Sequence, residues 1–182
     1  MADVIHYDYR LIPIIGRFGV EYGFGNKTVE TVCEENNINK WFFLEIINSF
    51  RNHQYFPQKQ LQNFTAKVII QYLSNTHSYY LEVKVPEIQS YIDEMEKKVS
   101  PENSKNVKLL NNFFKEYKEE LITHLANEDN RVYPYIISLE EAFSQKNIAQ
   151  TLVDKIKTDP IEKYERNHDD LEIKLSDLKI NH

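Results

Sequence analysis

The sequence predicts an all-α protein in which a small helical domain precedes a bundle of long helices. All four glycines fall between Gly16 and Gly25, and none follows. The later part of the chain repeats apolar residues at the spacing of one helix face. A long glycine-free segment with this periodicity is typical of a helical bundle. The glycine cluster itself predicts a tight segment with special backbone conformations near the N-terminus.

Residues 1–56 are expected to form the small domain, and Pro57 marks the expected boundary with a bundle over residues 57–182. Pro13 is expected to interrupt a short helix over residues 8–18. Thr28 and Asn39 are expected to cap the next two helices, since both residue types accept hydrogen bonds from the first free amides of a helix. The apolar side chains expected to be buried in these two helices are Val29, Val32, Cys33, Trp41, Leu44 and Ile47.

Three long helices are predicted in the second part. The first covers about residues 65–98 and the second about 104–143, separated by the turn-forming segment 100–104. Pro86 and Pro134 lie inside them and are expected to bend them, because proline removes one backbone hydrogen bond. The third helix is expected to begin near Pro160.

The pair His124 and Glu128 is the main candidate for chemistry. Residues four apart on a helix share a face, and this face also carries apolar side chains and is therefore expected to point into the core. A buried carboxylate must be neutralised, paired or bound to a metal. His77 and His168 also lie on the apolar stripes of their own predicted helices.

These four residues predict a metal site between helices, as helical bundles build them. Histidine with carboxylate and no thiolate suits non-haem iron or manganese, and zinc is an alternative. In a dinuclear site, Glu128 would bridge the two ions and leave a position open for O2 or NO. A second interpretation pairs Glu128 with Arg131, three residues along the same helix. The 12 tyrosines are expected mainly to fill the core; the alternative is that several of them lie beside the candidate ligands and supply hydrogen bonds to them.

The composition of the chain argues against several other classes of partner and site. The net charge is −6, from 22 basic and 28 acidic residues, which argues against nucleic acid or an anionic membrane as the main partner. The single cysteine, Cys33, excludes an intrachain disulfide and a cysteine-rich zinc site. No apolar run is long enough to span a membrane, and the first residues lack a leader pattern. A cytoplasmic protein is therefore expected.

Two alternative classes of function are a DNA-binding module and a structural bundle without metal. Residues 28–50 have the apolar spacing of a helix-turn-helix, but the segment lacks the basic face that phosphate contacts require. A purely structural bundle is the other alternative, with its histidines satisfied by tyrosines or backbone groups. No phosphate-binding loop or nucleophile motif is present, so conventional catalysis is poorly supported, and no enzymatic activity is assigned from the sequence.

Several segments resemble the hemerythrin-like di-iron proteins, specifically their iron–sulfur cluster repair branch. The matching segments are Tyr72 to Leu81, Val85 to Ile88, His124 to Glu128, Val132 to Tyr135 and Asn167 to Asp170, together with Leu11 to Glu30 for the family's N-terminal domain. The resemblance implies an up-and-down bundle that holds non-haem iron in a di-iron centre. It also implies repair of iron–sulfur clusters damaged by oxidative or nitrosative stress, with iron–sulfur proteins as clients. Sensing of O2 or NO, or iron storage, is the alternative within the same family. Carried onto this chain, His77, His124 and His168 resemble terminal iron ligands and Glu128 a bridging carboxylate.

Two departures from the family pattern stand out. The family's N-terminal domain carries adjacent cysteines where this chain has Tyr22, Gly23 and Phe24, so thiol chemistry is not expected there. The family also has a fourth bundle helix with its own His-x-x-x-Glu, and we expect that this chain stops before that helix. We expect either a fragment of a longer protein or a bundle completed by a second subunit in a homodimer. The sequence as it stands is expected to hold one iron ion, or two incompletely.

Overall fold

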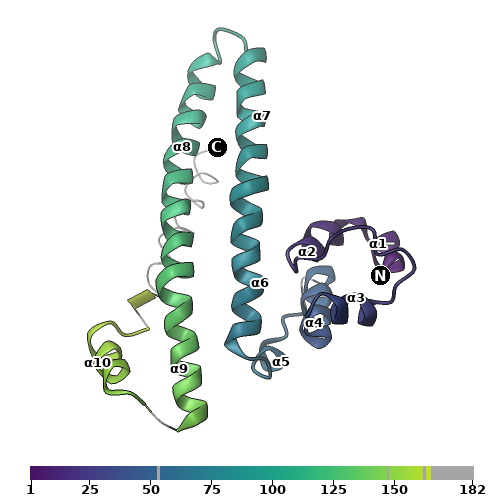
Figure 1. The fold of residues 1–182 in the computed structure, drawn as a ribbon. Coiled ribbons are helices and arrows are strands. Elements are labelled where there is room, and N and C mark those ends of the chain that lie inside the picture. Colours follow the sequence, from purple (N-terminus) through teal and green to yellow (C-terminus); the bar gives the residue numbers. More distant parts are fainter. Residues whose placement is uncertain (53, 147, 162, 165–182) are drawn as a thin grey trace. The chain divides into compact units, whose positions relative to one another are not determined.

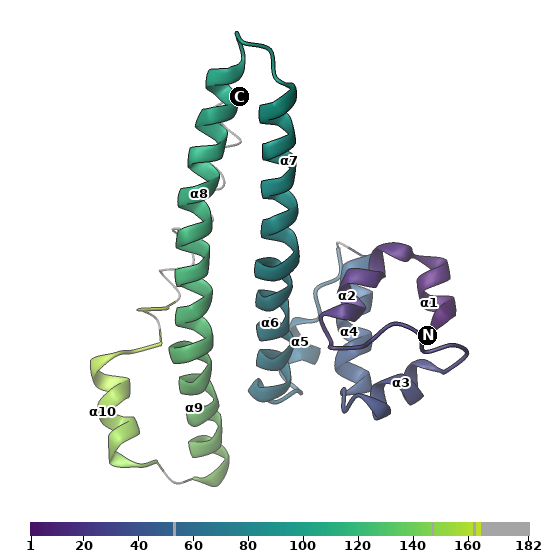
Figure 2. The same ribbon diagram turned by 45° about the horizontal axis from the view of Figure 1, so that its top comes forward.

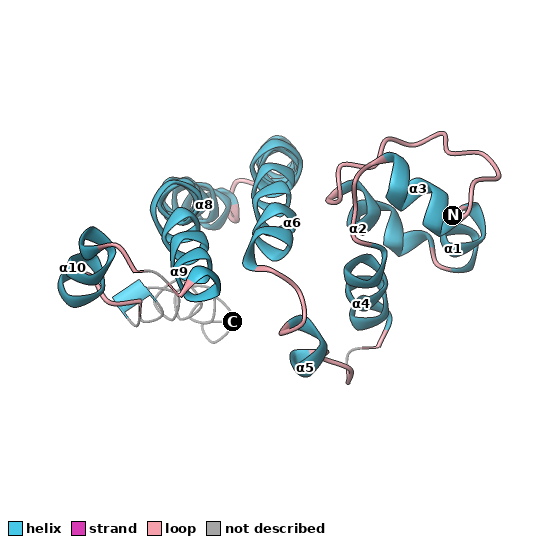
Figure 3. Ribbon diagram, turned by 60° about the horizontal axis from the view of Figure 1, so that its bottom comes forward, coloured by secondary structure: helices cyan, strands magenta, loops and turns pink. Residues whose placement is uncertain are grey.

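The computed structural model describes residues 1–52, 54–146, 148–161 and 163–164. In these ranges the chain consists of helices and connecting loops, without a strand (Figure 3). The prediction of an all-α helical protein is confirmed. No helix in the same ranges combines the length and the apolar character needed to cross a membrane.

The chain divides into two compact units, Met1–Ile88 and Gln89–His182. The expected separation of an N-terminal domain from a bundle at Pro57 stays a prediction.

The first unit is built from short helices followed by one long one (Figure 1). Its elements are α1 (Ala2–Tyr7), the 3-10 helix η1 (Tyr9–Leu11), α2 (Ile12–Gly16), α3 (Val29–Glu35), α4 (Lys40–Arg51), α5 (Gln58–Leu61) and α6 (Ala66–Tyr79). Pro13 lies in the first turn of α2 and begins this helix rather than interrupting one. The side chain of Thr28 accepts from the Thr31 amide at 3.1 Å, and that of Asn39 from the Trp41 and Phe42 amides. Both predicted caps are confirmed.

The core of this unit joins α2, α3 and α4. Its most buried side chains are Leu11, Ile14, Ile15, Val32, Cys33, Phe42 and Phe43. The rings of Phe18 and Phe42 also contact the ring of Tyr72, on α6. The start of the first long helix is therefore packed against the small N-terminal helices.

Two long helices each contain one wide turn. The first runs as α6, the π-helical η2 (Tyr80–Lys84) and α7 (Val85–Lys98). The second runs as α8 (Ser104–Asn127), the π-helical η3 (Glu128–Val132) and α9 (Tyr133–Gln145). The predicted spans of 65–98 and 104–143 agree closely with these bounds.

In the second unit, the last part of α7 and the start of α8 form a helical hairpin (Figure 2). The amide of Asn103 donates to the carbonyl of Ser100 at 3.0 Å in the connecting turn. The side chain of Gln89 donates to Asn111 at 3.2 Å, which joins the two helices. Beyond α9 lies a further helix, α10 (Gln150–Thr158).

Candidate metal centre

His124 and Glu128 lie side by side at the end of α8. Nε2 of His124 is 3.4 Å from Oε1 of Glu128. The two side chains are 15% and 7% exposed. The expectation that this helix face is turned inward is confirmed for Glu128, which is among the few buried charged residues of the described chain.

Tyr133 is the second partner of the Glu128 carboxylate. Its hydroxyl donates to Oε2 of Glu128 at 3.4 Å, and the tyrosine is itself buried. Burial raises the pKa of Tyr133 well above its usual value, and the negative charges of Glu128 and Asp129 raise it further. The phenol therefore stays protonated at neutral pH, as a donor to the carboxylate. Tyr133 thus makes the kind of hydrogen bond to a candidate ligand that was considered as the alternative to core filling.

The pair opens on a cavity of about 510 Å³. The cavity is lined by Glu119, Glu120, Thr123, His124, Asn127, Glu128, Val132 and Tyr164. Three of these side chains are carboxylates, and no lysine or arginine is among them. Carboxylates in a partly enclosed site attract and retain cations.

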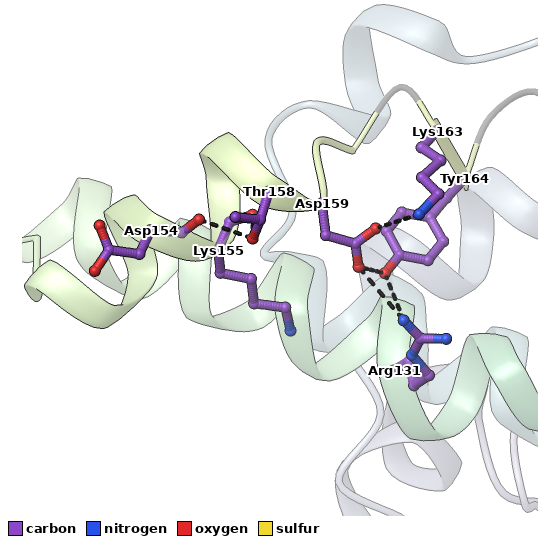
Figure 4. A network of polar contacts seen from close by, with 7 residues as sticks. All are labelled: Arg131, Asp154, Lys155, Thr158, Asp159, Lys163 and Tyr164. Atoms are coloured by element: carbon purple, nitrogen blue, oxygen red, sulfur yellow. Dashed lines mark hydrogen bonds and ion pairs between the residues drawn. The ribbon is translucent and has the colours of Figure 1, made fainter.

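One wall of the cavity is held in place by a polar network (Figure 4). The hydroxyl of Tyr164 donates to Oδ2 of Asp159, and Arg131 donates to the same oxygen at 3.4 Å. Lys163 pairs with Oδ1 of Asp159 at 3.2 Å. These donors, Tyr164 first, hold the pKa of Asp159 below its usual value. The network fastens Tyr164, beyond α10, to the wide turn that contains Arg131.

Arg131 therefore has a different role from the one considered in the sequence. It donates to Asp159 and to the hydroxyl of Tyr164, while Glu128 is contacted by His124 and Tyr133. The interpretation of Glu128 as the salt-bridge partner of Arg131 finds no support in this arrangement.

The four predicted ligands have different outcomes. His124 and Glu128 are brought together in the second unit. His77 lies in α6 of the first unit, where it is buried with 7% exposure. His168 lies outside the described residues. Within the described ranges, no group of three or more histidine, cysteine, aspartate or glutamate side chains is placed to hold a metal ion. The four-residue ligand set therefore stays a prediction.

The described donors nevertheless fit part of a non-haem metal site. An imidazole nitrogen and a carboxylate oxygen of neighbouring helical turns face one acidic cavity, and the carboxylate is oriented by a buried phenol. In metalloproteins, hydrogen bonds of this kind orient the side chains that bind the metal ion directly. Imidazole and carboxylate together suit iron, manganese or zinc. Cys33, in contrast, is buried away in the N-terminal core, and burial raises the pKa of its thiol.

Sequence reasoning did not single out Tyr133 or Tyr164. Tyr133 is five positions from Glu128, a spacing that does not share a face in an ordinary α-helix, and only the wide turn brings the two together. Tyr164 reaches the cavity through contacts between segments far apart in the sequence. The proline after Tyr133 was the available signal for the first of these.

Comparison with known proteins gives one distant similarity. The chain is similar to the iron–sulfur cluster repair protein ScdA of Staphylococcus haemolyticus, with 21% identity over 145 residues. The match covers 78% of this chain and 64% of that protein, so this chain spans less than two thirds of its relative's length. No family model and no solved structure matches the chain. The similarity supports the resemblance to iron–sulfur cluster repair proteins in general.

Proposed function

We propose that this protein takes part in the repair of iron–sulfur clusters and that it does so through non-haem iron bound at His124 and Glu128. The observation that carries the proposal is the pair of half-buried His124 and buried Glu128 on an acidic cavity, in a chain similar to a repair protein over 78% of its length. Neither part is sufficient alone. The His124–Glu128 pair offers donor atoms for iron, and the similarity to an iron–sulfur cluster repair protein suggests the process in which that iron is used.

The fuller version of the proposal has His77, His124 and His168 as terminal ligands and Glu128 as a carboxylate that bridges two iron ions. Bound iron would supply a redox-active, exchangeable metal for the damaged cluster and a binding position for O2 or NO. The chain's own residues do the rest. Glu128 provides the negative charge, Tyr133 fixes one of its oxygens, and Glu119 and Glu120 favour the approach of a cation from solvent.

Damage by oxidants or nitric oxide is the stress that this proposal implies, and iron–sulfur proteins would be the clients. The repair role is tested with an iron–sulfur hydro-lyase whose [4Fe–4S] cluster has been damaged by peroxide or by nitric oxide. The Fe(II)-loaded chain is added anaerobically, and recovery of the client's activity is followed against the same amount of free Fe(II).

We expect faster recovery with the loaded chain than with free iron. Glu128→Gln and His124→Ala should lower that recovery to the level of free iron. Glu116→Gln, at an exposed position of the same helix, serves as the matched control and should behave as wild type. Recovery no faster than with free iron would refute the repair role, and equal activity of all variants would refute the site.

A further inference from the structure

The two wide turns share one relation to proline. The π-helical segment Tyr80–Lys84 is followed by Val85 and Pro86, and the segment Glu128–Val132 is followed by Tyr133 and Pro134. In both cases the proline is the second residue after the wide turn. The repetition at two separate places in the chain indicates a common physical cause.

Proline supplies that cause. It has no amide hydrogen, and its ring clashes with the carbonyl four residues earlier in an α-helix. For Pro134 that carbonyl belongs to Asn130, in the middle of the wide turn. A π-helical turn takes in one extra residue, with hydrogen bonds from i to i+5, and so moves this carbonyl out of the path of the ring. The Asn130 side chain also donates to the carbonyl of Ala126 at 2.7 Å, which satisfies a backbone acceptor next to the irregular turn.

The extra residue changes which side chains share a face. At 3.6 residues per turn, positions 128 and 133 of a regular α-helix would point about 140° apart. In a π-helical turn, the residue five positions further along the chain lies approximately above the starting residue. The hydroxyl of Tyr133 accordingly reaches Oε2 of Glu128 at 3.4 Å. The equivalent residue of the other turn, Val85, is likewise buried, with 4% exposure.

We infer that Pro134 is a positioning residue for the candidate metal centre: it maintains the wide turn Glu128–Val132 and thereby places the Tyr133 hydroxyl on the Glu128 carboxylate. Pro134 itself is exposed and does not line the cavity. The expected effect of Pro134 on iron binding rests on the proposed function. Its expected effect on the conformation of the turn and on the Tyr133–Glu128 contact does not.

The geometric test uses the metal-free protein. In Pro134→Ala, residue 134 regains an amide hydrogen, so the turn should close to a regular α-helix and Tyr133 should rotate away from Glu128. Combining Pro134→Ala with deletion of Asn130 removes the extra residue. Tyr133 is then four positions from Glu128 in a regular helix and should regain the contact.

Crystal structures of the two variants, or side-chain contacts measured by NMR, decide the matter. The inference is supported if the Tyr133–Glu128 contact is lost in Pro134→Ala and restored by the deletion. It is overturned if the single variant keeps the wide turn and the contact, or if the deletion does not restore it. Should Pro134→Ala not fold, a folded double variant with the contact restored supports the inference, and a double variant without the contact overturns it.

Iron affinity gives a second readout. Loss of a hydrogen bond that orients a metal ligand typically weakens metal binding by about 10- to 100-fold. We expect this loss in Tyr133→Phe and in Pro134→Ala, and recovery of affinity in the double variant. Tyr135→Phe, two positions along the same helix and also buried, should leave affinity unchanged. If the wild-type chain binds no iron, the proposed function fails, while the metal-free structures still decide the role of Pro134.

Discussion

Replacement of Glu128 by glutamine separates a metal ligand from a structural residue. The substitution keeps the shape of the side chain and removes its charge. The contact of the carboxylate with His124 and its contact with Tyr133 each measure 3.4 Å. Charge-assisted hydrogen bonds are normally about 2.5–2.9 Å long, so each contact is expected to contribute less than the usual range of about 1.5–3 kcal/mol.

The loss of these contacts is partly offset, because glutamine avoids the cost of burying a charge. We therefore expect the free energy of unfolding of the metal-free protein to fall by about 1 kcal/mol or less. Removing a partner from a buried ion pair that holds the fold together costs about 3–5 kcal/mol. The two interpretations thus differ by an amount that is readily measured.

The assay is urea unfolding of metal-free wild type and Glu128→Gln, followed by far-UV circular dichroism. The slope of the free energy of unfolding against urea concentration must be the same for both proteins, so that a difference between their midpoints reports a difference in stability. Glu116→Gln provides the exposed control on the same helix. A loss of about 3 kcal/mol or more in Glu128→Gln would refute the reasoning and assign Glu128 a structural role.

Three further predictions concern other parts of the chain. Phe42→Ala should lower the free energy of unfolding by about 3–5 kcal/mol, because this ring is 2% exposed and makes edge-to-face contacts with the rings of Phe18 and Phe64. Urea unfolding checks this, and a loss under about 1 kcal/mol would contradict the described core. Asp159→Asn should lower the melting temperature at neutral pH, and the difference from wild type should shrink as the pH falls below the unfolded pKa of about 3.9, because the stabilisation from a lowered pKa is lost as the pH falls through the folded value. Equal melting temperatures of variant and wild type at neutral pH would contradict this prediction. Cys33 should resist thiol reagents at neutral pH until urea unfolds the chain, since it is buried and its pKa is raised; rapid labelling of the native protein would contradict its placement.

The helices themselves could be predicted largely from local signals. Thr28 and Asn39 are caps by chemistry that depends only on the residues that follow them, and the long helices follow the apolar period. Trp41 shows where such reasoning ends. The prediction that Trp41 is buried was wrong: its side chain is 65% exposed, while its neighbours Phe42 and Phe43 fill the core. Three adjacent aromatic residues cannot all face inward on a helix, and periodicity did not decide which would.

The candidate site shows the same division. The spacing of His124 and Glu128 is enough to predict their contact, because four residues make about one helical turn. The contact from Tyr133 could not be predicted with an α-helical period, since it depends on the wide turn before Pro134. Tyr164 depends on the path of the chain through α10, and no helix was predicted from the sequence over residues 150–158.

The most direct test of the central claim is anaerobic loading of the full chain with Fe(II), followed by measurement of bound iron per chain and of the absorption spectrum on exposure to air. We expect tightly bound iron in wild type, a near-ultraviolet band typical of an oxo-bridged pair of ferric ions, and loss of both in Glu128→Gln and His124→Ala. A wild-type chain that retains no iron, or variants that retain as much as wild type, would contradict the account.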